Sequence, residues 1–371
     1  MPSLPIEGVA EEQEVVAVDP LEEKVASMSD EELIGQMLVF KLDGVNSPSQ
    51  STIDMINKTH CSNFILLESN CNSFEQVNSL LSQTSSYNKD SDIPFWYCID
   101  EEGGDVTRFN LGIPSARKTA LSDDPEGNSR QNGENIAIAL RQAGIQLCLA
   151  PVLDTAKNLD KSSMGSRIFD SDPNTVANLG SEFIRGLHRH GIASSVKHFP
   201  GVGNTSVDSH DDFPVVKRSR EEIEGYELVP FRTVIQNSTD IVMVGHILLP
   251  AFDEDNPSSI SKTIVTDLLR GEMGWDGVVM TDDMYMGAIV SHYEVEDACL
   301  QAITAGVDMV LTISDGEVVY DRVLKALNDG TITRERLEES AKRIIKMKWK
   351  YELRADVVRG INTIWKKELL H

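Results

Sequence analysis

Short apolar runs alternate with longer amphipathic stretches along most of the chain after residue 20. Apolar runs of four to seven residues are typical of strands buried on both faces of a parallel sheet. Each run ends in polar or glycine-rich residues, and an amphipathic stretch follows it. The pattern predicts eight strands, at 36–40, 63–67, 95–99, 146–152, 193–197, 241–245, 277–281 and 308–312.

The stretches between these runs predict helices. Residues 73–76 and 219–222 have the spacing of a capping box, which marks the beginning of a helix. Residues 173–190 and 294–305 carry apolar side chains three and four positions apart, and 334–351 form a basic-rich amphipathic segment. Strands that alternate with helices in this way indicate the α/β class.

Eight strand–helix units predict a (β/α)8 TIM-type barrel, which we expect to form a single catalytic domain over residues 21–371. A doubly wound sheet is the alternative, but no GxGxxG follows the first strand, which weakens a dinucleotide-binding interpretation. Residues 1–20 are acidic and contain three prolines, so we expect a disordered lead or linker there. Such a lead favours a secreted or surface-anchored protein whose signal has been removed, with a cytoplasmic protein as the alternative.

Composition narrows the classes of partner. The net charge of −25 and the pI near 4.6 disfavour nucleic acid and anionic lipid surfaces as partners. No run approaches 18 apolar residues, so no membrane span is expected, and we expect a monomer. The five cysteines form no CxxC pair and are interpreted as mostly buried free thiols. We expect neither a metal nor another cofactor.

Polar side chains gather where the predicted strands end. In a parallel barrel these ends lie on one rim, where catalytic loops meet. Charged groups are costly to bury, so their coincidence at five strands favours a site over a set of structural caps, although a single member such as Asp154 fits either role. The clusters are 100–108, Asp154, Lys197 with His198, His246, and Asp282 with Asp283.

Asp208 and His210 stand two positions apart at the end of the segment 197–210, so in extended chain they point the same way. A carboxylate beside an imidazole fixes its tautomer and raises its pKa, which suits proton transfer near neutral pH. Asp211 and Asp212 lie nearby, but the segment lacks a recognised metal-ligand spacing.

Six motifs together are highly specific: DEEGGDVTR at 100–108, APVLD at 150–154, GSRIF at 165–169, KHFPGVGNTSVDSH at 197–210, a Met-x-x-His at 243–246 and VVMTDDMYMGA at 278–288. The chain resembles the β-N-acetylglucosaminidase branch of glycoside hydrolase family 3 over roughly residues 25–350. The resemblance implies a retaining enzyme that removes terminal β-linked N-acetylglucosamine through a covalent glycosyl–aspartate intermediate. It implies muropeptides, hence a part in peptidoglycan recycling and the cell wall, or chitin oligomers, as substrates.

The resemblance also assigns roles residue by residue. Asp282 matches the nucleophile, His210 the acid/base and Asp208 its partner. Apart from the resemblance, Glu101 or Glu102 on the rim would be the next candidates if His210 were not the acid. The positions that match the family's sugar-binding set are Asp100, Arg108, Arg167, Lys197, His198 and His246. His246 is the least firmly assigned of them.

Three positions depart from the family pattern. Asp105 stands where the family usually has Arg, Val202 replaces a common His, and Asn204 replaces a frequent Asp. None of them matches a catalytic position, so we expect them to affect loop dynamics and remote substrate contacts.

Other interpretations remain open at this point. A family 3 β-glucosidase or xylosidase is one, and a catalytically silent sugar-binding barrel is another. An aldolase would need a Schiff-base lysine at a strand end, for which Lys197 is the candidate. Within the hydrolase interpretation, either water or phosphate could accept the glycosyl group.

Overall fold

The structure, a computed structural model, describes residues 19–88, 93–205, 213–236 and 239–359, with the backbone alone for 353–359. Its eight parallel strands are neighbours in the order β7-β6-β5-β4-β3-β2-β1-β8, and a parallel bridge between Met280 and Met309 joins the two outer strands. The sheet thus closes, which confirms the predicted (β/α)8 barrel. The strands are β1 (Leu38–Lys41), β2 (Asn63–Leu66), β3 (Trp96–Ile99), β4 (Leu147–Cys148), β5 (Ala193–Phe199), β6 (Ile241–Val244), β7 (Val278–Thr281) and β8 (Val310–Thr312).

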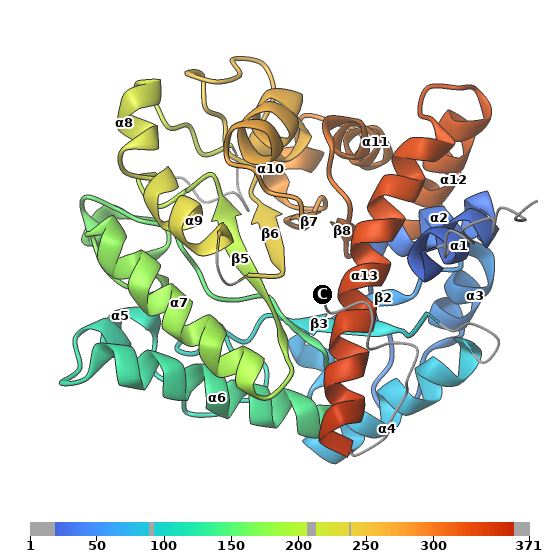
Figure 1. The fold of residues 1–371 in the computed structure, drawn as a ribbon, viewed down its shortest axis with the longest axis horizontal. Coiled ribbons are helices and arrows are strands. Elements are labelled where there is room, and N and C mark those ends of the chain that lie inside the picture. The colour runs from blue at the N-terminus through green and yellow to red at the C-terminus, as the bar shows by residue number, and fades with distance from the viewer. Residues whose placement is uncertain (1–18, 89–92, 206–212, 237–238, 360–371) are drawn as a thin grey trace, which may run out of the picture.

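Helices surround the strands (Figure 1). The α-helices are α1 (Pro20–Ser27), α2 (Asp30–Met37), α3 (Gln50–Thr59), α4 (Phe74–Ser85), α5 (Ala116–Ala120), α6 (Pro125–Ala143), α7 (Pro173–Arg189), α8 (Arg220–Glu224), α9 (Leu228–Ile235), α10 (Gly287–Val290), α11 (Val295–Ala305), α12 (Gly316–Asn328) and α13 (Arg334–Arg359). A π-helix (Thr263–Glu272) and 3-10 turns at Glu68–Asn70, Ser86–Asn88, Leu159–Lys161, Gly165–Arg167 and Ser258–Ile260 complete the set. Within the described ranges, no helix is both long and apolar enough to cross a bilayer.

The beginnings predicted for two helices, α4 and α8, are confirmed. Ser219 and Glu222 form the reciprocal capping box at α8. Ser73 caps α4 by accepting from the backbone N–H of Gln76, while the side chain of Gln76 accepts from the N–H of Asn72 instead of closing the box on Ser73. Each helix therefore begins where its sequence signal lies.

Each predicted strand overlaps an observed one, but all eight differ from it by at least one residue at an end, and two of these differences have a clear cause. The capping box at Ser29 begins α2, which continues through Gln36 and Met37, so β1 starts two residues later than the apolar pattern indicated. In the run 146–152 only Leu147 and Cys148 form a strand; Pro151 has no N–H to donate to a ladder, and beyond it Val152 pairs with Lys197 as an isolated bridge.

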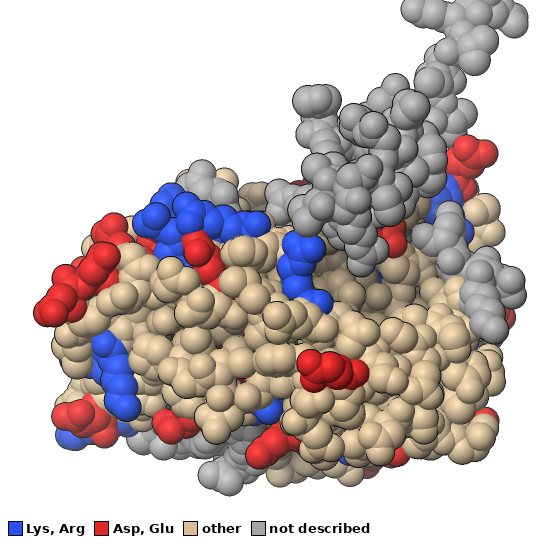
Figure 2. Space-filling model, turned by 90° about the horizontal axis from the view of Figure 1, so that it is seen from below, with Lys and Arg blue, Asp and Glu red and all other residues tan. Residues whose placement is uncertain are grey.

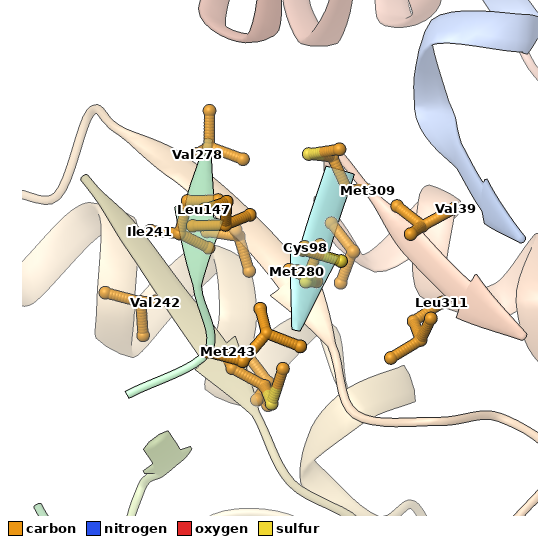
Figure 3. Close-up of a cluster of buried hydrophobic side chains, with 14 of the residues drawn as sticks. Val39, Cys98, Leu147, Ile241, Val242, Met243, Val278, Met280, Met309 and Leu311 are labelled. Atoms are coloured by element: carbon orange, nitrogen blue, oxygen red, sulfur yellow. The ribbon is translucent and has the colours of Figure 1, made fainter. Parts of the chain in front are cut away.

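Apolar side chains from most of the strands pack into one core (Figure 3). Labelled members come from β1, β3, β4, β6, β7 and β8, and they are buried. All five cysteines are free, and four of them are buried, as the sequence indicated. On the face in Figure 2, acidic and basic side chains are dispersed among uncharged ones, and no extended surface of a single sign is visible there.

The end of the barrel opposite the strand C-termini contains a fully buried lysine on α13. The ammonium of Lys348 donates to Gln36 Oε1 (3.0 Å), Ser62 Oγ (2.9 Å) and the carbonyl of Pro94 (3.2 Å). These three residues precede β1, β2 and β3, so one side chain ties the starts of three strands to the last helix. Burial lowers the pKa of Lys348 to about 7.

We expect the stability of the protein to rise with pH because of this lysine. Between about pH 7 and 10.5 the unfolded chain binds a proton at Lys348 that the folded protein does not, so the free energy of unfolding rises as pH rises. Lys348→Met should remove up to about 1.4 kcal/mol per pH unit from that slope. Urea unfolding of both proteins from pH 7 to 10 measures it; parallel profiles would show that Lys348 keeps its proton in the fold.

Candidate active site

The C-terminal ends of the strands surround a cavity of about 460 Å³. Seven of the nine predicted site residues line it, although they come from segments up to 182 positions apart in the sequence (282 − 100). They are Asp100, Arg108, Arg167, Lys197, His198, His246 and Asp282. The other two, Asp208 and His210, lie outside the described residues.

Asp282 follows β7 directly and faces this cavity. Its backbone N–H donates to the carbonyl of Val244 on β6 (2.9 Å), and its Oδ1 accepts from the N–H of Asp283 (2.9 Å). Burial raises the pKa of Asp282, but electrostatic interaction with His198, His246 and Lys197, together with the hydrogen bond from the N–H of Asp283, outweighs burial and holds the pKa below its ordinary value. The carboxylate is therefore anionic at neutral pH, as a nucleophile must be.

Asp283 has a different position from its neighbour. Its Oδ1 accepts from the N–H groups of Tyr285 (3.0 Å) and Ile313 (3.2 Å), which fixes the loop after β7 to the loop after β8. His246 donates from Nε2 to the carbonyl of Asp283 (2.9 Å) and bonds Ser259 Oγ through Nδ1 (2.7 Å). His246 thus forms part of the cavity wall and also holds the turn that carries Asp282.

Asp154, for which the sequence left two roles open, is fully buried behind His198. Its Oδ2 lies 2.7 Å from His198 Nδ1, and its Oδ1 accepts from the N–H of Val202 (2.7 Å). With Nδ1 directed to Asp154, the Nε2 of His198 faces the cavity, 3.9 Å from Asp282 Oδ2 and 3.5 Å from Arg167 Nη2. Asp154 therefore orients a cavity-lining imidazole and anchors the glycine-rich segment after β5.

A network of opposite charges forms one wall of the cavity. Lys197 Nζ lies 2.6 Å from Asp100 Oδ1 and 2.7 Å from Glu102 Oε1. Glu102 also accepts two hydrogen bonds from Arg167, at 2.9 and 2.8 Å. Arg108 Nη2 lies 3.4 Å from Asp100 Oδ2. Every cation of this wall is paired with a carboxylate, so the wall suits a neutral, hydroxyl-rich ligand better than an anion.

The charges in this network are fixed by their mutual attraction. Burial lowers the pKa of Lys197 and raises that of Glu102, yet in each case the opposite charges prevail: the pKa of Lys197 lies above its ordinary value and that of Glu102 well below. Arg167, with a raised pKa, keeps its charge as well. Removing one member would leave uncompensated buried charge, which costs about 3–5 kcal/mol.

Glu102 is a site residue to which the sequence assigned only an alternative role as the acid. The structure makes that role untenable, because a carboxylate held by Lys197 and Arg167 has no proton to give near neutral pH. Glu101 is equally unsuited: it is fully buried and accepts from the N–H groups of Arg108 (2.8 Å) and Phe109 (3.1 Å) and from the hydroxyl of Thr107. Both glutamates organise the loop after β3.

Of the three departures from the family pattern, Val202 lines the cavity, whereas Asp105 and Asn204 do not. Asp105 is on the surface, where its carboxylate accepts from Ser166 Oγ (3.1 Å). Val202 is buried, and Asn204 accepts from the N–H of Lys157 (2.9 Å). Within the described part of the chain, no group of three or more His, Cys, Asp or Glu side chains could hold a metal ion.

The family comparison agrees with this geometry. Residues 21–347 match the family model described as glycosyl hydrolase family 3 N terminal domain. The β-hexosaminidase LpqI of Mycobacterium tuberculosis is 35% identical over 268 residues, which span 69% of this chain and 68% of that protein. An uncharacterised secreted glycosyl hydrolase of Arthroderma benhamiae is 30% identical over 326 residues, covering 84% and 90% of the two chains.

A solved structure shares the fold as well. The family 3 β-N-acetylglucosaminidase of Paenibacillus sp. str. FPU-7 superposes with a TM-score of 0.85 at 32% identity, over 92% of this chain and 68% of that one. The chain therefore belongs to glycosyl hydrolase family 3, in its β-N-acetylglucosaminidase branch, and is a glycoside hydrolase.

Proposed function

We propose that this enzyme removes terminal, non-reducing β-linked N-acetylglucosamine with retention of configuration, using Asp282 as the nucleophile. The observation that carries the proposal is the position of Asp282, anionic at the strand ends of the barrel and open to the cavity beside the charged wall. Retaining glycosidases need such a carboxylate under the anomeric carbon.

In the first step, an oxygen of Asp282 attacks the anomeric carbon while the bond from that carbon to the leaving oxygen breaks. His210 gives its proton to the leaving oxygen, and Asp208 stabilises the imidazolium beforehand. In the second step, His210 takes a proton from water, the hydroxyl adds to the anomeric carbon, and Asp282 leaves as the carboxylate. Phosphate in place of water would give the sugar phosphate.

Two features of the described rim support a histidine as the acid. The nearby carboxylates Asp100, Glu101 and Glu102 all accept hydrogen bonds from cations, N–H groups or a hydroxyl, so none is poised to donate a proton. Asp283 is committed to two backbone N–H groups. The Asp208–His210 pair of the sequence supplies the group that these carboxylates do not.

The sugar hydroxyls would meet the charged wall. Asp100, Lys197 and Arg167 present fixed acceptors and donors whose positions are set by their ion pairs, so little entropy is lost on binding. His198 presents its Nε2 beside Asp282, and His246 closes the wall behind it.

We propose muropeptides or chitin oligomers as the natural substrates and a secreted or surface-anchored, monomeric enzyme. The likeness to the β-hexosaminidase LpqI favours a β-hexosaminide substrate, and the likeness to the secreted glycosyl hydrolase of Arthroderma benhamiae favours secretion. A cytoplasmic enzyme is the alternative.

Turnover of 4-nitrophenyl β-N-acetylglucosaminide and of 4-nitrophenyl β-glucoside, measured side by side, tests the proposal. We expect kcat/KM to be at least about 100-fold higher for the N-acetylglucosaminide, because the site would use the acetamido group to position the ring. A preference for the glucoside would move the enzyme to the β-glucosidase group. Binding of N-acetylglucosamine without turnover of either compound would indicate a silent barrel.

A further inference from the structure

Tyr285 lies on the turn that follows the proposed nucleophile, three positions after Asp282. It lines the same cavity as Asp282, yet it is 42% exposed. The residues of the charged wall are far more buried, since Lys197 is 2% and His198 8% exposed. Tyr285 therefore lies at the mouth of the cavity, and the charged wall lies deeper.

The aromatic ring of Tyr285 has no counterpart elsewhere in the cavity. Among the described residues that line the cavity, Tyr285 is the only Phe, Tyr or Trp. Six large apolar side chains are exposed in the same part of the chain, and of these only Tyr285 lines the cavity. Tyr226 has two cations over its ring, and Tyr293 packs edge-on against Phe213. An aromatic side chain that is exposed at the mouth of a cavity is typical of a ligand-binding surface.

The backbone around Tyr285 is fixed at three points. The N–H of Tyr285 donates to Asp283 Oδ1 (3.0 Å). The N–H of Met284 donates to the carbonyl of Leu311 on β8 (2.9 Å), and that of Met286 donates to the carbonyl of Asp283 (3.0 Å). Met284 is fully buried and anchors the turn in the core. A tyrosine on such a turn has only two side-chain torsions left to order when a ligand binds, so little entropy is lost.

The leaving group of the proposed reaction departs toward this side of the cavity. A carboxylate that displaces an oxygen at the anomeric carbon attacks from the face opposite to that oxygen. Because Asp282 is attached at the strand ends, the bond that breaks points away from it, toward the mouth. The N-acetylglucosamine that is removed then lies beside the charged wall, and the group attached to its anomeric oxygen lies at the level of Tyr285.

We propose that Tyr285 is a specificity-determining residue: it forms the surface on which the second N-acetylhexosamine ring, the one that leaves, packs. This inference rests on the proposed function. A pyranose with equatorial substituents carries axial C–H bonds on both faces, and their partial positive charge is attracted by the negative face of an aromatic ring. The contact also removes apolar surface of both partners from water. Chitin oligomers and muropeptides both present such a ring at this position.

The test compares a disaccharide with a substrate that has no second ring. The aglycone of N,N′-diacetylchitobiose is N-acetylglucosamine, whereas N-acetyl-β-glucosaminyl fluoride releases only fluoride. For Tyr285→Ala we expect kcat/KM to fall by about 10-fold on the disaccharide and to change by less than about twofold on the fluoride, because only the disaccharide reaches the tyrosine. Tyr285→Phe keeps the ring and should retain at least about half of the wild-type kcat/KM on the disaccharide.

Tyr87→Ala is the matched control. Tyr87 is 45% exposed, much as Tyr285 is, but it does not line the cavity. Its replacement should change kcat/KM on neither substrate. A third substrate, N-acetylglucosamine β-1,4-linked to N-acetylmuramic acid, adds a lactyl ether to the leaving ring. The larger loss of Tyr285→Ala on one of the two disaccharides identifies the aglycone that the tyrosine binds better.

The outcomes separate the two proposals. If the wild-type enzyme hydrolyses neither the fluoride nor a disaccharide, the proposed function fails. If it hydrolyses them, but Tyr285→Ala loses the same factor on all three substrates or loses nothing on the disaccharides, this inference alone is overturned. Hydrolysis of the fluoride without that of either disaccharide would overturn it as well. Should thermal unfolding show that Tyr285→Ala does not fold, Tyr285→Gln, which keeps a long polar side chain at the surface, carries the same expectation.

Discussion

Asp282→Asn should lower kcat/KM by about 10⁴-fold or more and leave the fold intact, because an amide cannot form the glycosyl ester. The amide oxygen can still accept from the N–H of Asp283, as Oδ1 does in the wild type, and its size is unchanged. Hydrolysis of an aryl β-N-acetylglucosaminide together with thermal unfolding measures both effects. Near-wild-type turnover in folded Asp282→Asn would remove the residue from the mechanism.

Asp283→Asn is the matched control, one position along the chain. Its Oδ1 accepts from two backbone N–H groups, and an amide oxygen can do the same. We therefore expect activity within about tenfold of the wild type and a stability loss of about 1 kcal/mol, since a neutral acceptor bonds more weakly than a charged one. The contrast between adjacent aspartates distinguishes loss of the nucleophile from general damage to the turn.

His210→Ala should lose activity in proportion to the need of the leaving group for a proton. On natural oligosaccharides, whose leaving alcohols are poor, we expect about 10²- to 10⁴-fold loss in kcat/KM, the usual contribution of a general acid. On an activated nitrophenyl glycoside the loss of glycosylation rate should be much smaller. Asp208→Ala should act in the same direction, because an imidazole without a carboxylate has a lower pKa and a freer orientation.

The measurement is the ratio of mutant to wild-type kcat/KM across leaving groups of increasing pKa. A flat ratio would show that His210 is not the acid. Glu101 and Glu102, the alternatives that the sequence offered, could not then take over as they stand, since both are committed to hydrogen bonds and ion pairs. The general acid would then have to come from outside the described residues of the rim.

The barrel could be predicted because its signal is local. Each strand is a short apolar run, and each helix beginning carries its own capping residue, so the eight-fold alternation is readable without any long-range information. The errors lie at element ends, where another interaction decides. Gln36 belongs to α2 rather than β1 because the helix begun at Ser29 continues through it.

The candidate site was predictable only in part. Charged residues after apolar strands mark the rim, and seven of them do line one cavity. What the sequence could not assign is which of two neighbours is engaged by the backbone. Asp282 and Asp283 are adjacent acidic residues that both line the cavity, yet only the Oδ1 of Asp283 joins the loops after β7 and β8. Tyr285 belongs to one of the six motifs, but only the fold places it at the mouth of the cavity.

The attachment of Asp282 has a consequence for how such an enzyme diversifies. Its backbone N–H is bonded to the carbonyl of Val244 on β6, so the proposed nucleophile is attached directly to the barrel wall, while its neighbour Asp283 is bonded to the loop after β8. Insertions or substitutions in the peripheral loops can therefore change which aglycone fits, while the carboxylate of Asp282 keeps its position. New substrate preferences can thus evolve on this scaffold through changes in the peripheral loops, while the residues at the strand ends stay the same.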